Sequence, residues 1–155
     1  MALPRIKVAK DKAELVRKLL DSKETRSAFQ TYADILVFAA SFGIKNHKKV
    51  PLKEISHSEP APISLEVFVS RGYDWVIKLI AVTDTQDPKI LSDYEPQAEA
   101  QRVKIFEEYA NAGLEKLREE LRGAVDYTER ILLILNAERF QEEEIEEEFD
   151  LSHFL

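Results

Sequence analysis

The sequence contains no cysteine and few glycines or prolines, with four Gly and six Pro among 155 residues. Without cysteine there are no disulfides, thiol nucleophiles or thiolate metal sites, and a reducing compartment is favoured. The four glycines, at 43, 72, 113 and 123, cannot form a phosphate-binding loop or a dinucleotide fingerprint. Catalysis that depends on a thiol or on a Gly-rich phosphate loop is therefore excluded.

Long apolar runs are also missing. The longest, from Ile35 to Ala40, is much shorter than the ~20 residues that a membrane span requires. The N-terminus is charged from Arg5 onward and has no apolar region of the kind found in signal peptides. We therefore expect a cytoplasmic protein that does not contact a membrane.

The composition is that of a helix-rich globular protein, with 45% hydrophobic and 33% charged residues. A chain of this length can form one domain with an ordinary core. We expect a mainly α fold, a single compact multi-helix domain over residues 1–140, followed by an acidic C-terminal tail over 141–155. Apolar spacing predicts helices at about 11–22, 31–42, 63–70, 73–82, 95–121 and 125–137.

A short strand is predicted before the first helix, because polar and apolar residues alternate from Arg5 to Ala9. Ile6 and Val8 should then point to one side, and Arg5 and Lys7 to the other. The chain would open as strand, helix, helix. The segment 45–62 contains several Lys and Pro residues and is predicted to be a long loop with one extended segment at 50–52.

The segment from Ile35 to Ala40 is apolar nearly all round, which predicts a central, buried helix. The longest helix is predicted to contribute one apolar face. Its apolar stripe consists of Val103, Phe106, Ala110, Leu114, Leu117 and Leu121. Gly113 in this helix permits either a break or a close helix contact. Four residues of the 73–82 segment are also assigned to the core, namely Trp75, Ile77, Leu79 and Ile80.

The charge is unevenly distributed along the chain. Residues 1–53 contain 12 Lys/Arg and 5 Asp/Glu, a net +7, whereas residues 54–155 contain 10 and 24, a net −14. Basic side chains on one face would neutralise DNA phosphates and release counterions. The candidate DNA-binding residues are Arg5, Lys7, Lys10, Lys12, Arg17, Lys18, Lys45, Lys48 and Lys49. A strand that inserts into a DNA groove, as in ribbon-helix-helix proteins, and a plain solvated surface remain as alternatives.

The C-terminal segment is strongly acidic, with eight Asp/Glu between Glu138 and Asp150. It is either a helix that frays into a solvated tail or a segment that folds onto a partner. In the second case its apolar residues would bind the partner, and the candidates are Ile145, Phe149, Leu151 and Phe154.

No catalytic residues, cofactor or metal site are predicted. The three imidazoles, His47, His57 and His153, have no second ligand at helical spacing. The carboxylates of the longest helix, Glu107, Glu108, Glu115, Glu119 and Glu120, are expected on its solvent side. A nuclease using carboxylates and a divalent ion would need a clustered pair in a loop, which the sequence does not offer.

Four blocks of the sequence resemble the DNA phosphorothioation-associated protein 4 family, also called Dnd system-associated protein 4. They are residues 5–12, 30–40, 105–113 and 123–127. The resemblance extends from about residue 5 to 140 and leaves the acidic tail outside. It implies association with bacterial systems that replace a non-bridging phosphate oxygen of DNA by sulfur, or with defence machinery that uses the mark. The family provides no catalytic motif to transfer.

Our first hypothesis is a non-enzymatic accessory protein of a phosphorothioation or linked restriction system, acting through DNA or protein contacts. The other proteins of that system are its expected partners, and a homodimer is compatible with the sequence. The alternative is a protein-interaction adaptor that uses the acidic tail and does not contact DNA.

Overall fold

A computed structural model describes residues 4–20 and 28–154, with side chains up to residue 140. The chain divides into two compact units, residues 1–119 and 120–155. The predicted domain boundary at residue 140 stays a prediction. The mainly α fold with a short N-terminal strand is confirmed. In chain order the elements are β1 (Arg5–Ile6), η1 (Lys10–Lys12), α1 (Ala13–Leu20), α2 (Tyr32–Lys45), β2 (Ile63–Ser64), α3 (Leu65–Ser70), α4 (Asp74–Thr85), η2 (Pro88–Leu91), α5 (Pro96–Glu120) and α6 (Tyr127–Phe154).

The N-terminal strand pairs within its own chain. β1 is antiparallel to β2, with Arg5 opposite Ser64 and Ile6 opposite Ile63. Ile6 and Val8 are buried while Arg5 and Lys7 are exposed, as the alternation predicted. A strand inserted into a DNA groove requires pairing with a second subunit, whereas β1 is paired here with β2. The segment assigned to a helix from residue 63 thus begins as a strand, because it supplies the partner of β1.

The second helix begins where its capping residues stand. The Thr31 side chain accepts a hydrogen bond from the Asp34 backbone, and the Asp34 carboxylate accepts one from Thr31 N at 3.1 Å. This reciprocal pair satisfies two of the free N–H groups at a helix start. α2 continues to Lys45, beyond the predicted end at residue 42, since Gly43 lies inside the helix.

The backbones of α2 and α5 approach each other closely at Gly43 and Gly113. A Cβ atom built on Gly113 would lie 1.7 Å from the Ala39 carbonyl oxygen, and one built on Gly43 would lie 2.2 Å from that of Tyr109. Only glycine therefore permits this approach. Of the two alternatives for Gly113, the structure shows the close helix contact, and α5 continues through it without a break.

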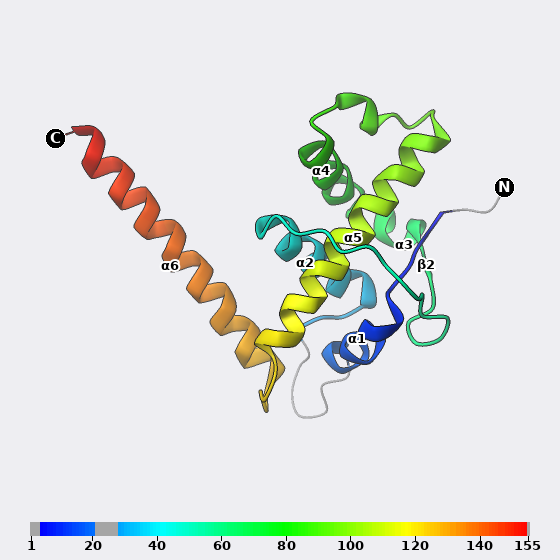
Figure 1. Ribbon diagram of the computed structural model, residues 1–155, viewed down its shortest axis with the longest axis horizontal. Helices are drawn as coiled ribbons and strands as arrows, with labels where there is room; N and C mark the ends of the chain where they lie inside the picture. The colour runs from blue at the N-terminus through cyan, green and yellow to red at the C-terminus, as the bar shows by residue number, and fades with distance from the viewer. Residues whose placement is uncertain (1–3, 21–27, 155) are drawn as a thin grey trace. The chain divides into compact units, whose positions relative to one another are not determined.

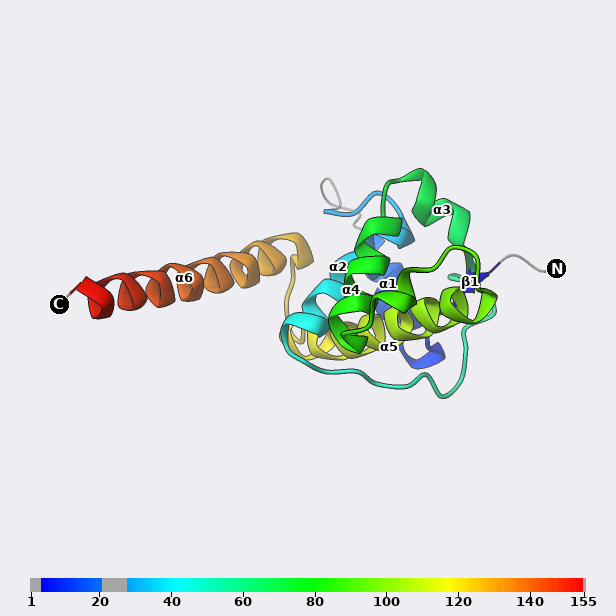
Figure 2. The same ribbon diagram turned by 90° about the horizontal axis from the view of Figure 1, so that it is seen from above.

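α5 extends through the first unit, and the 46–62 segment crosses it in the view of Figure 1 and runs alongside it in the view of Figure 2. The predicted stripe from Val103 to Leu121 is buried throughout. The carboxylates of α5 were expected to face solvent, but Glu107 is only 7% exposed. Its side chain accepts a hydrogen bond from the Lys7 backbone at 2.6 Å and so joins α5 to the chain that follows β1.

α4 buries one side and exposes the other. Ile77 and Ile80 belong to the core as predicted, but Trp75 and Leu79 are 73% and 64% exposed, so their assignment to the core was wrong. The physical reason is that α4 is apolar nearly all round, so that spacing alone does not select the buried face.

The second unit contains one long helix. α5 ends at Glu120, and Gly123 follows with a φ of 77°. α6 then begins at Tyr127, where the Asp126 carboxylate accepts a hydrogen bond from Glu129 N at 3.2 Å. The helix was predicted to end near residue 137, but its backbone remains helical to Phe154. Within this unit Leu121 and Ile131 are buried.

Candidate functional site

The nine predicted DNA-binding residues do not form one free basic surface. Lys12 is only 2% exposed, so its side chain is not available to a DNA backbone at the surface. Ion pairs hold three exposed members: Lys10 with Glu54 at 3.7 Å, Lys18 with Glu14 at 3.2 Å, and Lys49 with Asp84 at 3.1 Å.

The remaining members differ in their surroundings. Arg17 donates a hydrogen bond to the Glu59 carbonyl at 2.7 Å. Lys45 is not a free side chain either, because it contacts another group of the protein. Lys7 is exposed, although its backbone is tied to α5. Within the described part of the chain, Arg5 and Lys48 are exposed and form no ion pair.

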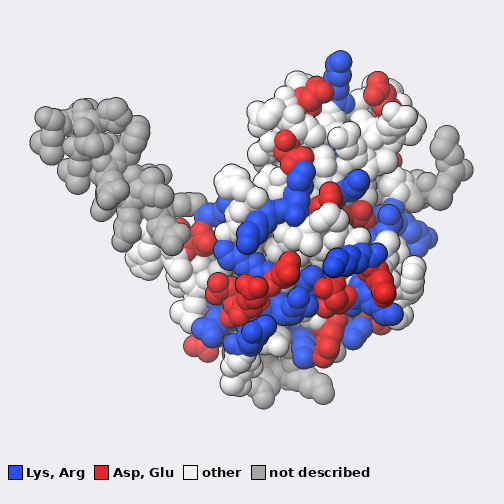
Figure 3. All heavy atoms as spheres, viewed as in Figure 1, with Lys and Arg blue, Asp and Glu red and all other residues white. Residues whose placement is uncertain are grey.

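Charges of both signs are mixed on the face of the first unit shown in Figure 3, where blue and red side chains alternate across its lower half. The counts of charged residues in the two units agree with this mixing of charges. Residues 1–119 contain 19 Lys/Arg and 18 Asp/Glu, a net +1, and residues 120–155 contain 3 and 11, a net −8. The basic front of the sequence is thus largely compensated within its own unit, and the acidic excess belongs to the other unit.

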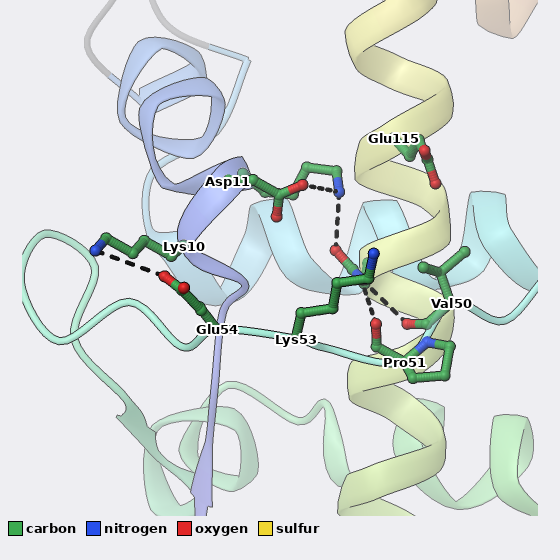
Figure 4. Close-up of a pocket in the computed structure, with 9 residues that line it drawn as sticks. Lys10, Asp11, Val50, Pro51, Lys53, Glu54 and Glu115 are labelled. Carbon is green, nitrogen blue, oxygen red and sulfur yellow. Dashed lines mark hydrogen bonds and ion pairs between the residues drawn. The ribbon is translucent and has the colours of Figure 1, made fainter.

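A pocket of about 420 Å³ lies in the first unit, where η1, the 50–54 segment and α5 meet (Figure 4). Backbone hydrogen bonds hold two of these parts together, from Lys10 N to the Glu54 carbonyl at 2.9 Å and from Ser56 N to the Val8 carbonyl at 2.8 Å. Val50 N donates to the Glu108 carbonyl of α5 at 3.1 Å. Three segments that are distant in sequence are thus fixed around one cavity.

Lys12 and Asn111 form the buried wall of the pocket. The Lys12 ammonium donates to Asn111 Oδ1 at 3.2 Å and to Asp11 Oδ2 at 3.1 Å. The Asn111 amide nitrogen donates to the carbonyls of Val50 and Pro51, at 3.1 and 3.4 Å. These two bonds fix the amide so that its oxygen faces Lys12. A buried ammonium group is costly without such partners.

Two further residues of the pocket, Lys53 and Glu115, were not among the predicted site residues. Lys53 extends from the 50–54 segment toward α5, and Glu115 lies on α5 one turn after Asn111 (Figure 4). Neither has an ion pair or a hydrogen bond to the described residues. No sequence pattern distinguishes them, because Lys53 stands in a loop among other lysines and Glu115 among other helical glutamates.

Asp34 is the centre of a polar cluster at the start of α2. Arg71 donates to both carboxylate oxygens, at 3.1 and 3.0 Å, and the Tyr73 hydroxyl donates to Oδ1. Burial alone would raise the pKa of Asp34, but the hydrogen bonds from Tyr73, Arg71 and Thr31 outweigh it and lower that pKa. This cluster ties α2 to the turn between α3 and α4.

A second cluster joins α4 to α5. The Tyr109 hydroxyl donates to Asp84 at 2.6 Å, and Lys49 lies 5.8 Å from the centre of the Tyr109 ring. Burial and the Asp84 carboxylate raise the pKa of Tyr109 to about 12. The pKa of Asp84 is lowered, because its bonds to Tyr109 and Lys49 outweigh the effect of burial. All three side chains are occupied in these contacts, which indicates a structural role.

The candidate partner-binding residues Ile145, Phe149, Leu151 and Phe154 lie outside the described side chains. The part of α6 that precedes them has apolar side chains at the surface. Its exposed apolar residues are Leu132, Leu133, Leu135 and Phe140, which are 46–66% exposed. A contiguous exposed apolar patch is typical of a surface that binds another protein, so this part of α6 is a candidate for such a surface.

The described residues contain no group of three His, Asp or Glu side chains that could hold a metal ion. None of the helices in this part of the chain has the length and apolar content needed to cross a bilayer.

A protein-family model matches nearly the whole chain. The family described as DNA sulphur modification system-associated protein 4 matches residues 5–154. The resemblance was expected to end near residue 140, but the match includes the acidic segment, which is therefore part of the family pattern. No curated protein and no solved structure matches the chain.

Proposed function

Because the chain belongs to the DNA sulphur modification system-associated protein 4 family, we propose that it is a non-enzymatic accessory protein of such a system or of a restriction system linked to it. The family match over residues 5–154 is the observation on which this proposal rests. We place its action in the bacterial cytoplasm, where the modified DNA and the other proteins of the system are found.

In this proposal, direct DNA contact involves the exposed basic residues of the first unit. Arg5 and Lys48 are exposed and form no ion pair with the described residues, so no internal contact must break before they reach a phosphate. The net charge of +1 in the first unit limits the expected affinity. Binding should therefore be weak, and its affinity should fall as the salt concentration rises.

Salt-dependent binding to duplex DNA with and without phosphorothioate tests this contact. Replacing Arg5 and Lys48 by Ala should reduce the slope of log affinity against log salt by about 1.8, since each phosphate contact contributes about 0.9. The control is Lys89→Ala with Lys104→Ala, which removes the same charge from two exposed residues outside the predicted set. No binding at the lowest salt, or an equal effect of both variants, would exclude these residues as the contact.

The second candidate function is a protein-interaction adaptor that uses α6. It is favoured by the exposed apolar residues Leu132, Leu133, Leu135 and Phe140 and by the acidic composition of the same unit. Removal of residues 141–155, or Leu132→Ser with Leu135→Ser, should then abolish co-purification with the other proteins of the modification system. The circular dichroism of the serine variant should stay unchanged. Unaltered co-purification of both variants would exclude α6 as the binding surface.

A further inference from the structure

The pocket between η1, the 50–54 segment and α5 has the features of a binding site for a small molecule. Its volume of about 420 Å³ lies within the range of about 300–1,000 Å³ that is typical of ligand sites. Its walls are joined by backbone hydrogen bonds and by the fixed Asn111 amide, so the cavity is formed before any ligand enters. A preformed site avoids the cost of ordering its walls when a ligand binds.

Lys12 provides an unused hydrogen-bond donor in the buried wall. An ammonium group has three N–H bonds, and Lys12 uses one for Asn111 and one for Asp11. No third acceptor is found among the described residues. The Asp11 side chain is 65% exposed, whereas that of Lys12 is 3% exposed. Solvent therefore screens the Asp11 carboxylate, and this carboxylate neutralises the buried Lys12 ammonium only in part. An anionic oxygen in the pocket would complete the hydrogen bonding of Lys12.

Lys53 and Glu115 add one free charge of each sign. The other ionisable groups of the lining are paired with each other, Lys10 with Glu54 and Lys12 with Asp11. The six groups together have no net formal charge, because three are lysines and three are carboxylates. A ligand with only negative charge would leave the Glu115 carboxylate unpaired, and one with only positive charge would leave the Lys53 ammonium unpaired. A molecule with both charges satisfies both residues.

We propose that this pocket binds a small zwitterion of the amino-acid type. Its carboxylate would be held by Lys12 and Lys53, and its ammonium group by Glu115. Val50 and Pro51, which also line the cavity, provide an apolar surface for a short aliphatic side chain. The proposal does not depend on DNA binding or on the proposed accessory function.

Three small molecules of the same shape test it. L-Valine has both charged groups, isobutylamine lacks the carboxylate, and 3-methylbutanoate lacks the ammonium group. We expect L-valine to bind with a dissociation constant on the order of 1 mM. Each analogue should bind about 10- to 100-fold more weakly, because a hydrogen bond to a charged group is lost. The measurement is a titration of the isotope-labelled full chain by NMR, in which the side-chain amide signal of Asn111 reports on the pocket directly.

Variants of the two free residues complete the test. Lys53→Met and Glu115→Gln should each weaken L-valine binding about 10-fold or more without unfolding the protein, since neither side chain has a partner to lose. Lys89→Met is the control, because Lys89 is an exposed lysine that neither lines the pocket nor belongs to the proposed DNA contact. No shift of the Asn111 signal at about 20 mM L-valine, or binding of inorganic phosphate in place of valine, would overturn the proposal.

Discussion

Replacing Gly113 by alanine should destabilise the protein, although the same change stabilises most helices. Gly113 lies inside α5, where alanine is favoured over glycine by about 1 kcal/mol. The added Cβ would lie 1.7 Å from the Ala39 carbonyl oxygen and 2.5 Å from its carbon. Both atoms are backbone, so no side chain can rotate away to relieve the contact.

The magnitude follows from the distance that α2 and α5 would have to separate. Ordinary contact begins near 3.4 Å, so the two backbones must move apart by up to 1.7 Å. Overpacking of this kind costs about 3 kcal/mol at the upper end of the usual range. With about 1 kcal/mol returned by helix propensity, we expect a net loss of about 2 kcal/mol. For a chain of this size the melting temperature should fall by roughly 4–8 °C.

Urea denaturation followed by circular dichroism measures this change. The matched control is Ala100→Gly at an exposed position of the same helix, which should cost about 1 kcal/mol through propensity alone. Gly43→Ala should act in the same direction as Gly113→Ala, since its Cβ would lie 2.2 Å from the Tyr109 carbonyl oxygen. If Gly113→Ala stabilises the protein by about 1 kcal/mol, the close crossing of α2 and α5 is refuted.

Three further changes probe the buried polar groups. Asn111→Ala should lower the free energy of unfolding by about 2–4 kcal/mol in urea denaturation, because the Lys12 ammonium loses its buried acceptor. Adding Lys12→Met to this variant should recover part of the lost stability. No recovery would contradict this reason. Burial raises the pKa of Glu107, so its contribution to stability is present below the ordinary glutamate pKa and is lost as pH rises through the raised value. Glu107→Gln should therefore become more stable relative to the parent as pH rises through that window, and parallel pH profiles of the urea midpoint would count against it. Burial would raise the pKa of Asp34, but hydrogen bonds from Tyr73 and other donors outweigh it and lower that pKa. The contribution of Asp34 to stability is therefore present above the ordinary aspartate pKa and is lost as pH falls through the lowered value. Asp34→Asn should lower the thermal midpoint at neutral pH and flatten its decline in acid, and an unchanged acid decline would show that this cluster is not responsible.

Local sequence patterns determined most of the secondary structure. The alternation around Ile6 and Val8 predicted which side chains of the N-terminal strand are buried. Apolar spacing predicted a second helix from about residue 31, where Thr31 caps α2. The stripe from Val103 to Leu121 predicted the buried face of α5. These features depend on residues within one or two turns of each other, so the sequence contains the necessary information.

Tertiary structure alone decided which surfaces are covered. Trp75 and Leu79 are exposed because α4 presents its other side to the core, and residues 63–64 form a strand because β1 lies beside them. Both outcomes depend on neighbours that are distant in sequence, and local patterns do not identify such neighbours.

The candidate site, too, depends on tertiary structure more than on local sequence patterns. Its residues come from η1, from the 50–54 segment and from α5, and no local pattern links these three parts of the chain. In the sequence Lys12 is one of several lysines, and Glu107 is one of several glutamates on a helix. Their burial follows from the close packing of the N-terminal segment against α5, where each finds a hydrogen-bond partner about a hundred residues away. The sequence thus determined the helices and the family, and the packing of distant segments determined which charged groups face a cavity, because burial is a property of the assembled chain.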